Sequence, residues 1–189
     1  MSERKMYFVR HGESVANSLG VLAGSIDYPL SQLGIEQATA LSNLIENDPA
    51  INPSLIVSSP LKRALDTAKI IAGTGLMPIV LDNLAAASGG DLEGRPYTKW
   101  YEVREQELCD HGAEDARMLY KRAGRAALDI MNFHNNMPAG DTIIVSHAGL
   151  YQMMVAYCQK LYPETLGYNI KKPTNGQLVE LNLLAEGDD

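Results

Sequence analysis

The side chains in this sequence that are best suited to chemistry are two histidines, each placed where a run of apolar residues ends. His11 follows such a run in MYFVRHG (residues 6–12), and His147 follows another in DTIIVSHAGL (141–150). A neutral imidazole is a workable nucleophile toward phosphorus, and its unperturbed pKa is about 6.5. Glycines follow closely at Gly12 and Gly149, and a glycine allows a ligand to approach the backbone.

Two arginines accompany these histidines. Arg10 precedes His11 directly, and Arg63 lies about one helical turn beyond the apolar segment SLIVSS (54–59). Guanidinium groups match phosphate oxygens in bidentate fashion. Positive charges from the arginines and from a protonated second histidine are expected to lower the pKa of a histidine nucleophile. The residue types therefore predict a phosphoryl-transfer site that needs no metal ion, because cationic side chains hold the oxygens.

The elements that must position these side chains alternate along the chain. Apolar segments predict strands and amphipathic segments predict helices; the expected strands are 6–9, 54–59, 77–82, 141–146 and 177–184, and the expected helices are 31–46, 60–73, 97–131 and 148–162. This order predicts an α/β fold, a three-layer α/β/α sandwich with a mainly parallel sheet. Ligands bind at the carboxyl ends of the strands in such sheets, so both histidines and both arginines are expected at one edge.

Three other features concern the rest of the chain. We expect a single domain over 1–189 with a small cap region at about 85–118, between the third and fourth strands. Residues 17–28 are expected to form a loop, because they contain Gly20, Gly24 and Asp27. His111 is expected in a loop and His134 on the surface.

Composition excludes several classes of function. The chain has 189 residues, 46% of them hydrophobic and 21% charged, which is typical of a soluble globular protein. A net charge of −7 argues against a nucleic-acid partner. The apolar run after the N-terminus is too short for a signal-peptide core or a membrane span, and two cysteines without metal spacing favour a reducing compartment. We therefore expect a cytoplasmic protein with no membrane partner, and the oligomeric state stays open, a homodimer included.

Five ordered segments resemble the histidine phosphatase (phosphoglycerate mutase-like) superfamily. FVRHGESVAN (8–17) is similar to its RHG signature, and VSHAGL (145–150) to its second histidine motif. The intervening segments are GSIDYPLSQLGIEQA (24–38), SSPLKRALDTA (58–68) and GGDLEG (89–94). Together they extend over most of the chain in the order that the family has, which is far more specific than one RHG alone.

The resemblance implies a role for each matching residue. His11 would accept the phosphoryl group, giving a phosphohistidine that water hydrolyses. Arg10, Arg63 and His147 would hold the phosphate oxygens. Asn17 and the backbone near Ala148 would complete the binding site, and Ser25 would lie near the substrate. The resemblance implies no cofactor and a small phosphorylated metabolite as substrate.

One position departs from the family's pattern. The family has a glutamate after the third strand as proton donor to the leaving group, and here LAAASGGDLEG (84–94) has Ala86 at that place. The loss of a general acid typically lowers the rate by about 10²–10⁴-fold. Three explanations are open: an engineered inactive variant, which we prefer, a proton from Asp82, Asp91 or Glu93, with Asp91 preferred, or a substrate whose leaving group needs no acid.

The expected activity is that of a phosphatase, since a short chain with a modest cap leaves the site open to water. A cofactor-dependent phosphoglycerate mutase-type phosphotransferase resembles every motif above and is the alternative enzyme. A non-catalytic protein that binds phosphorylated ligands is the alternative outside enzymes. The sequence does not indicate which phosphorylated metabolite is bound.

Overall fold

A five-stranded sheet forms the centre of the protein. The computed structural model describes residues 4–96, 109–137, 139–161 and 170–183. The strands are β1 (Met6–Arg10), β2 (Pro53–Ser58), β3 (Ile79–Val80), β4 (Asp141–Ser146) and β5 (Leu178–Glu180), in the order β3-β2-β4-β1-β5. β1, β2, β3 and β4 are parallel, and β5 runs antiparallel to β1.

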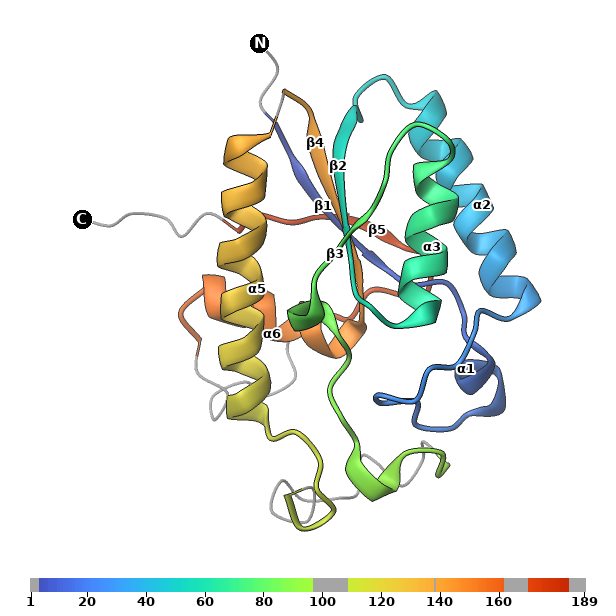
Figure 1. Ribbon diagram of the computed structural model, residues 1–189, viewed down its shortest axis with the longest axis vertical. Helices are drawn as coiled ribbons and strands as arrows, with labels where there is room; N and C mark the ends of the chain where they lie inside the picture. The colour runs from blue at the N-terminus through green and yellow to red at the C-terminus, as the bar shows by residue number, and fades with distance from the viewer. Residues whose placement is uncertain (1–3, 97–108, 138, 162–169, 184–189) are drawn as a thin grey trace.

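Helices cover both faces of this sheet (Figure 1). On one face lie α2 (Gln32–Asn47) and α3 (Lys62–Ala72), and on the other lie α5 (Ala116–Asn136) and α6 (Ala148–Cys158). Short helices occur in the connections: α1 (Val15–Leu19), η1 (Asp82–Leu84) and η2 (Gly90–Leu92). The predicted α/β class with a mainly parallel sheet flanked by helices is therefore confirmed.

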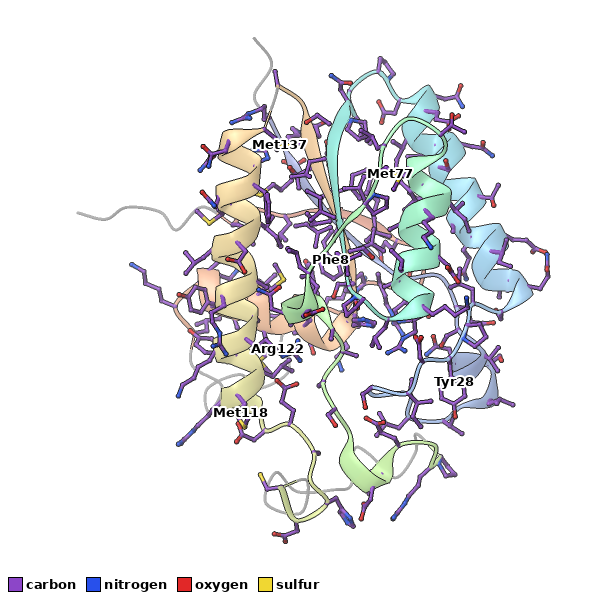
Figure 2. The ribbon with its side chains drawn as sticks, in the orientation of Figure 1. Phe8, Tyr28, Met77, Met118, Arg122 and Met137 are labelled. Atoms are coloured by element: carbon purple, nitrogen blue, oxygen red, sulfur yellow. The ribbon has the colours of Figure 1, made fainter. Side chains whose placement is uncertain are left out.

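The alternation of side chains along the strands creates two apolar cores. Phe8, Val57 and Ile144 pack with α5 and α6, in a core that lies in the interior of the molecule (Figure 2). Their strand neighbours Val9 and Val145 pack with α2 and α3. Successive side chains of a strand point to opposite faces, so a sheet covered on both faces needs the continuous apolar runs that the sequence contains.

The segment after the RHG motif is partly helical, although the sequence analysis placed residues 17–28 in a loop. Ser14 caps α1 with its hydroxyl, Asn17 bonds back to the Ser14 backbone N–H, and Gly20 ends the helix with φ of 66°. A capping box followed by a left-handed glycine is a recognised signal for helix boundaries. The helix was missed because it is only five residues long.

Three further expectations differ from what the structure shows. The last strand is β5, three residues rather than the whole of 177–184. His134 is buried instead of exposed, and its Nδ1 lies 2.8 Å from the Thr142 hydroxyl at the start of β4. The helix predicted at 97–131 is interrupted, because residues 109–110 are helical, residues 111–115 are not, and α5 begins at Ala116. The part of it at 97–108, in the middle of the expected cap region, lies outside the described residues.

A close approach of two backbones fixes the RHG loop against α2. A Cβ atom at Gly12 would lie 2.4 Å from the carbonyl oxygen of Gly34, and one at Gly34 would lie 2.0 Å from that of Glu13. Both positions therefore require glycine. Among the described residues, no helix combines the length and the apolar character that crossing a membrane would require.

Candidate active site

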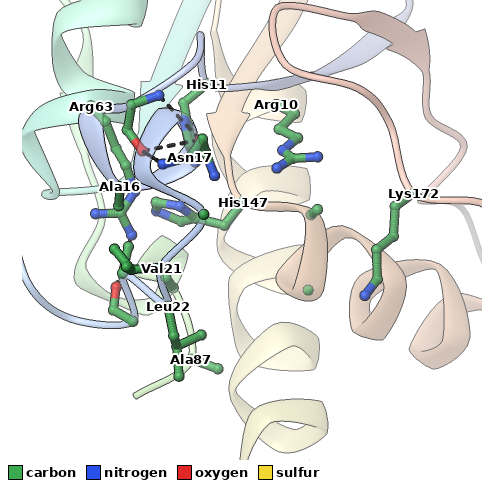
Figure 3. Close-up of a pocket in the computed structure, with 17 residues that line it drawn as sticks. Arg10, His11, Ala16, Asn17, Val21, Leu22, Arg63, Ala87, His147 and Lys172 are labelled. Atoms are coloured by element: carbon green, nitrogen blue, oxygen red, sulfur yellow. Dashed lines mark hydrogen bonds between the residues drawn. The ribbon is translucent and has the colours of Figure 1, made fainter. Parts of the chain in front are cut away.

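The carboxyl ends of three parallel strands meet at one pocket. His11 follows β1, Ser59 follows β2 and His147 follows β4. The two imidazole rings lie edge to face, with centroids 5.1 Å apart. A pocket of about 410 Å³ opens beside them (Figure 3) and is lined by Arg10, His11, Ser14, Ala16, Asn17, Gly20, Val21, Leu22, Ala23, Gly24, Arg63, Ala86, Ala87, His147, Ala148, Gly149 and Lys172. The structure thus brings together both histidines and both arginines that the sequence analysis selected.

The hydrogen bond of His11 defines which of its ring nitrogens carries the proton. Its Nδ1 lies 2.7 Å from the carbonyl oxygen of Gly12. A carbonyl only accepts, so Nδ1 carries the proton and Nε2 has the lone pair. Burial and the nearby Arg63 lower the pKa of His11 to about 3, against the effect of the Gly12 bond. The free protein therefore holds His11 neutral, the form that can attack phosphorus.

His147 is oriented by a hydroxyl from the end of β2. Its Nε2 lies 2.8 Å from the Ser59 Oγ, which also accepts from the backbone N–H of Leu61. With Ser59 donating to Nε2, the proton of the neutral ring is on Nδ1, a buried atom with no hydrogen-bond partner among the described residues. The residue lines the pocket, and Nδ1 is the nitrogen of its ring that has no partner among the described residues.

The charge state of His147 differs from the expectation. Burial, followed by His11 and Arg63, holds the pKa of His147 well below its usual value. A protonated second histidine is therefore not what lowers the pKa of His11. Desolvation of both rings is the larger cause, because a charged imidazole loses its hydration in this pocket.

Arg63 is a buried cation held by backbone carbonyls. Its side chain donates to the carbonyls of Gly24 and Ile26, at 2.8 and 3.0 Å. Burial lowers its pKa to about 10, with Asp27 acting in the opposite direction, so the guanidinium remains charged at neutral pH. Thr67 links it to the RHG loop: its hydroxyl donates to the Arg63 carbonyl and accepts from the N–H of Gly12.

A segment near the C-terminus holds the RHG motif from the other side. Arg10 donates to the carbonyl of Pro173 at 3.1 Å, and the Asn175 amide donates to the His11 carbonyl at 2.9 Å. The N–H of Gly176 donates to the Arg10 carbonyl. Sequence reasoning missed this segment, and with it Lys172, which lines the pocket. Its available signal is Thr-Asn-Gly at 174–176, a turn-forming sequence.

The structure separates the two remaining polar candidates. Asn17 lines the pocket. Its amide oxygen accepts from the Ser14 backbone and from Asn175, so its nitrogen is the atom that can donate to a phosphate. Ser25 does not line the pocket; its N–H and hydroxyl both donate to Glu93. Ala148, by contrast, lines the pocket at the start of α6.

Ala86 lies in the pocket wall on a loop that several groups fix in place. The Ser146 hydroxyl donates to the carbonyl of Leu84 at 2.7 Å. Arg122, from α5, donates to the carbonyl of Ala85 at 2.7 Å and of Ala86 at 3.3 Å. The same guanidinium pairs with Glu114 through two hydrogen bonds. The methyl group of Ala86 therefore occupies a rigid part of the wall.

None of the three carboxylates considered as substitute proton donors lines this pocket. Asp91 is exposed and contacts His111 at 2.6 Å, with Arg95 nearby. Glu93 accepts from Ser25 and from the N–H of Gly89. Asp82 lines a different hollow beside α5. Within the described part of the chain, the arrangement thus gives no support to Asp91 as the acid.

Comparison with known proteins agrees with the geometry. The sequence profile of the histidine phosphatase superfamily (branch 1) matches residues 6–187. A curated relative from Yersinia pestis, named "Probable phosphoglycerate mutase GpmB", is 32% identical over 151 residues, which are 76% of this chain and 69% of the relative.

Solved structures show the same fold. A mycobacterial glucosyl-3-phosphoglycerate phosphatase with VO3 has a TM-score of 0.77 at 26% identity, covering 95% of this chain and 93% of that one. A phosphoserine phosphatase mutant from Entamoeba histolytica in complex with phosphoserine has a TM-score of 0.75 at 24% identity, covering 93% and 89%. With the profile matching almost the whole chain and the RHG strand, the second histidine and the sheet in place, this protein belongs to the histidine phosphatase superfamily.

Proposed function

We propose that this protein is a metal-independent phosphomonoesterase that transfers the phosphoryl group of a small metabolite to Nε2 of His11 and then to water. The observation that carries the proposal is the state of His11. Its Nδ1 proton is held by the Gly12 carbonyl, and its Nε2 is buried, neutral and placed beside two guanidinium groups. A neutral nucleophile next to a cationic oxyanion site fits phosphoryl transfer.

The pocket supplies the charge stabilisation that this reaction needs. Arg10 and Arg63 would bind the non-bridging oxygens of the phosphate dianion, and the Nδ1–H of His147 would donate to the same group. Asn17 and the backbone of Ala148 would complete the contacts. Phosphoryl transfer depends mainly on positioning and on charge stabilisation, and every one of these residues lines the same pocket.

The reaction would then proceed in two displacements. The lone pair of His11 Nε2 forms the N–P bond while the bond from phosphorus to the leaving oxygen breaks, and the leaving group departs with the electron pair. Water then attacks the phosphohistidine, and the N–P bond breaks with its electron pair returning to Nε2. The product leaves as dihydrogen phosphate, which carries both protons of the water. His11 returns to its neutral form with the proton still on Nδ1.

Ala86 determines which leaving groups react well. A methyl group cannot donate a proton, and no Asp or Glu lines the pocket among the described residues. Leaving groups that are stable as anions, such as phenolates, should therefore depart much faster than alkoxides. For alkoxides, the missing acid would lower the rate by about 10²–10⁴-fold. This is a substrate range that the sequence analysis left open, and it applies whether Ala86 is native or engineered.

Phosphatase activity is favoured over the two alternatives. A solved structure that is 26% identical to this chain is named as a phosphatase, and the pocket opens to solvent beside the half-buried Ala86 and Ala87. A phosphoglycerate mutase-type activity is the second candidate, because the curated relative carries that name. A non-catalytic binder has less support, because His11 has the hydrogen bond to Gly12 and the neutral state that a nucleophile needs.

The test is phosphate release from p-nitrophenyl phosphate, whose leaving group needs little protonation. We expect turnover by the unsubstituted protein and none by His11→Gln, with His134→Gln as a control that changes a histidine remote from the pocket. Turnover retained in His11→Gln would refute the role of His11. Absence of turnover with intact binding of phosphate esters would support the non-catalytic binder, and interconversion of phosphoglycerates faster than phosphate release would support the mutase.

A further inference from the structure

We propose that the pocket binds phosphate monoesters whose leaving group is an apolar aromatic ring, which packs against an apolar wall formed by residues 20–24 and 86–87. This assignment names a substrate class for the proposed function, on which it rests for the position of the reacting phosphate. The first wall segment follows α1 and the second follows η1. Every lining residue that they contribute is an alanine, a valine, a leucine or a glycine.

The apolar wall adjoins a group that binds the phosphate in the proposed function. Arg63 donates to the carbonyl of Gly24, at one end of the wall, over 2.8 Å. Figure 3 shows Val21 and Ala87 on one side of the pocket, below Arg63 in the view. In the proposed function the leaving group lies beside Ala86, which belongs to the same wall. A phosphate ester bound to Arg63 therefore extends its leaving group along the wall.

Backbone groups of the wall are already bonded within the protein. The N–H of Leu22 donates to the carbonyl of Arg95 at 2.9 Å, and the Leu22 carbonyl accepts from the N–H of Gly94 at 2.8 Å. The N–H of Val21 donates to the carbonyl of Ala16 at 3.0 Å. Burial of a hydroxyl group without a hydrogen-bond partner is costly. A sugar or polyol leaving group therefore fits this wall poorly, and an apolar ring fits it well.

Contacts with the GGDLEG segment hold the wall in place before a ligand binds. A Cβ atom at Gly89 would lie 2.6 Å from Cδ2 of Leu22, so the Leu22 side chain packs against the backbone of that segment. Glu93 accepts from the N–H of Ser25 at 2.7 Å and from that of Gly89 at 2.8 Å, which connects the chain just after the first wall segment to the same loop. A preformed wall binds a ring without the entropic cost of ordering side chains.

An aromatic ring also suits the chemistry of the pocket. Ala86 has no proton to donate, and no Asp or Glu lines the pocket among the described residues. The leaving oxygen must therefore depart as an anion, and a phenolate is far more stable than an alkoxide. The ring thus meets two separate requirements, which are apolar contact with the wall and a stable leaving anion.

The experiment compares ligands that differ by the exchange of one methyl group for a hydroxyl group. Calorimetry measures the binding of 3-ethylbenzylphosphonate and of 3-(hydroxymethyl)benzylphosphonate, which cannot be hydrolysed. For turnover, kcat/KM is measured on 3-ethylphenyl phosphate and on 3-(hydroxymethyl)phenyl phosphate, whose phenols are of similar acidity. Each pair is also measured as its 4-substituted isomers, because the two positions direct the substituent to different parts of the wall.

Two variants make the wall polar with side chains of similar shape. Leu22→Asn is matched by Leu19→Asn, which changes an exposed leucine outside the pocket lining. Val21→Thr is matched by Val80→Thr, which changes an exposed valine of β3. Because threonine keeps the shape of valine, Val21→Thr tests the wall even where Leu22→Asn fails to fold.

We expect the unsubstituted protein and both controls to prefer the ethyl ligand of at least one isomer pair by about fivefold, in binding and in kcat/KM, which is the effect of burying one methyl group. Each wall variant that folds should reduce this preference to about twofold or less. No preference in the unsubstituted protein, or the same preference in every variant, would overturn the assignment.

Two further outcomes separate the wall from the reacting phosphate. An equal loss of affinity for both ligands of a pair in the wall variants would overturn the assignment, because it would place these residues on the phosphate. Preference for the ethyl phosphonate without phosphate release from any aryl phosphate would refute the proposed function and support the apolar site.

Discussion

Burial of a neutral His11 makes the stability of this protein depend on pH in a way that one substitution can isolate. The pKa of His11 is about 3 in the folded protein, with burial as the first cause, and about 6.5 in an unfolded chain. At pH values between these two, the His11 imidazole is protonated in the unfolded chain and neutral in the folded protein. Stability contributed by this group is therefore complete above pH 6.5 and is lost as the pH falls toward 3.

The expected size follows from those two pKa values. Lowering the pH from 7 to 5 stabilises the unfolded chain through this one imidazole by about 2 kcal/mol, which is the integrated linkage for a single proton. His147 adds to the loss, because its pKa is also lowered by burial. His11→Gln keeps a polar side chain of similar size without a titrating group, so it should remove only the contribution of His11.

The assay is urea unfolding at pH 7 and pH 5, followed by circular dichroism, in buffers without phosphate or sulfate. The unsubstituted protein should lose about 2 kcal/mol more than His11→Gln between the two pH values. An equal loss in both proteins would show that His11 is not held neutral in the fold. That result would refute the reasoning that presents its Nε2 as an unprotonated nucleophile.

Three other predictions concern the residues that position the site. Ala86→Glu should raise kcat/KM on alkyl phosphates by about 10²-fold or more, and on aryl phosphates much less. Ala85→Glu is the control, because Ala85 is not among the residues that line the pocket. Equal gains on both substrate classes would mean that residue 86 does not face the leaving group. Gly12→Ala should lower the free energy of unfolding in urea by about 1–3 kcal/mol, because the new Cβ would lie 2.4 Å from the Gly34 carbonyl oxygen. Gly75→Ala is the control and should change it little, because a Cβ there meets no atom within 4 Å. Equal losses of stability in the two variants would contradict the close approach. Arg122→Met should lower the free energy of unfolding by about 3 kcal/mol, because it leaves the Glu114 carboxylate unpaired. Adding Glu114→Gln should restore part of that stability. A double variant no more stable than Arg122→Met would refute this pairing.

Local sequence patterns predicted much of the fold and the central part of the site. One apolar run ends at Arg10 and His11 and another ends at His147, and both predicted buried strands. Parallel strands place their carboxyl ends at one edge of the sheet. The location of Arg63 followed from its distance beyond the second strand. These predictions succeed because they depend on strand periodicity and on topology, which short stretches of sequence contain.

The features that were missed depend on contacts between distant segments. Asn175 bonds to the RHG loop, and Lys172 lines the pocket, from the segment just before β5, which pairs antiparallel with β1. Pairing between two ends of the chain leaves no local sequence pattern. His134 is polar but buried, because Thr142 on β4 provides a hydrogen-bond partner. Ser25 resembles a substrate contact in sequence, yet Glu93 occupies its hydrogen-bonding groups. Partners of this kind decide the role of a polar residue, and they are visible only in the folded structure.

The central claim is that His11 carries the phosphoryl group, and trapping that species tests it most directly. The protein is mixed with ³²P-labelled p-nitrophenyl phosphate, quenched with alkali within milliseconds, and the label is located by mass spectrometry of peptides. A base-stable, acid-labile phosphohistidine is expected at residue 11, present in His134→Gln and absent from His11→Gln. Phosphate release with no labelled protein, or with the label on another residue, would contradict it.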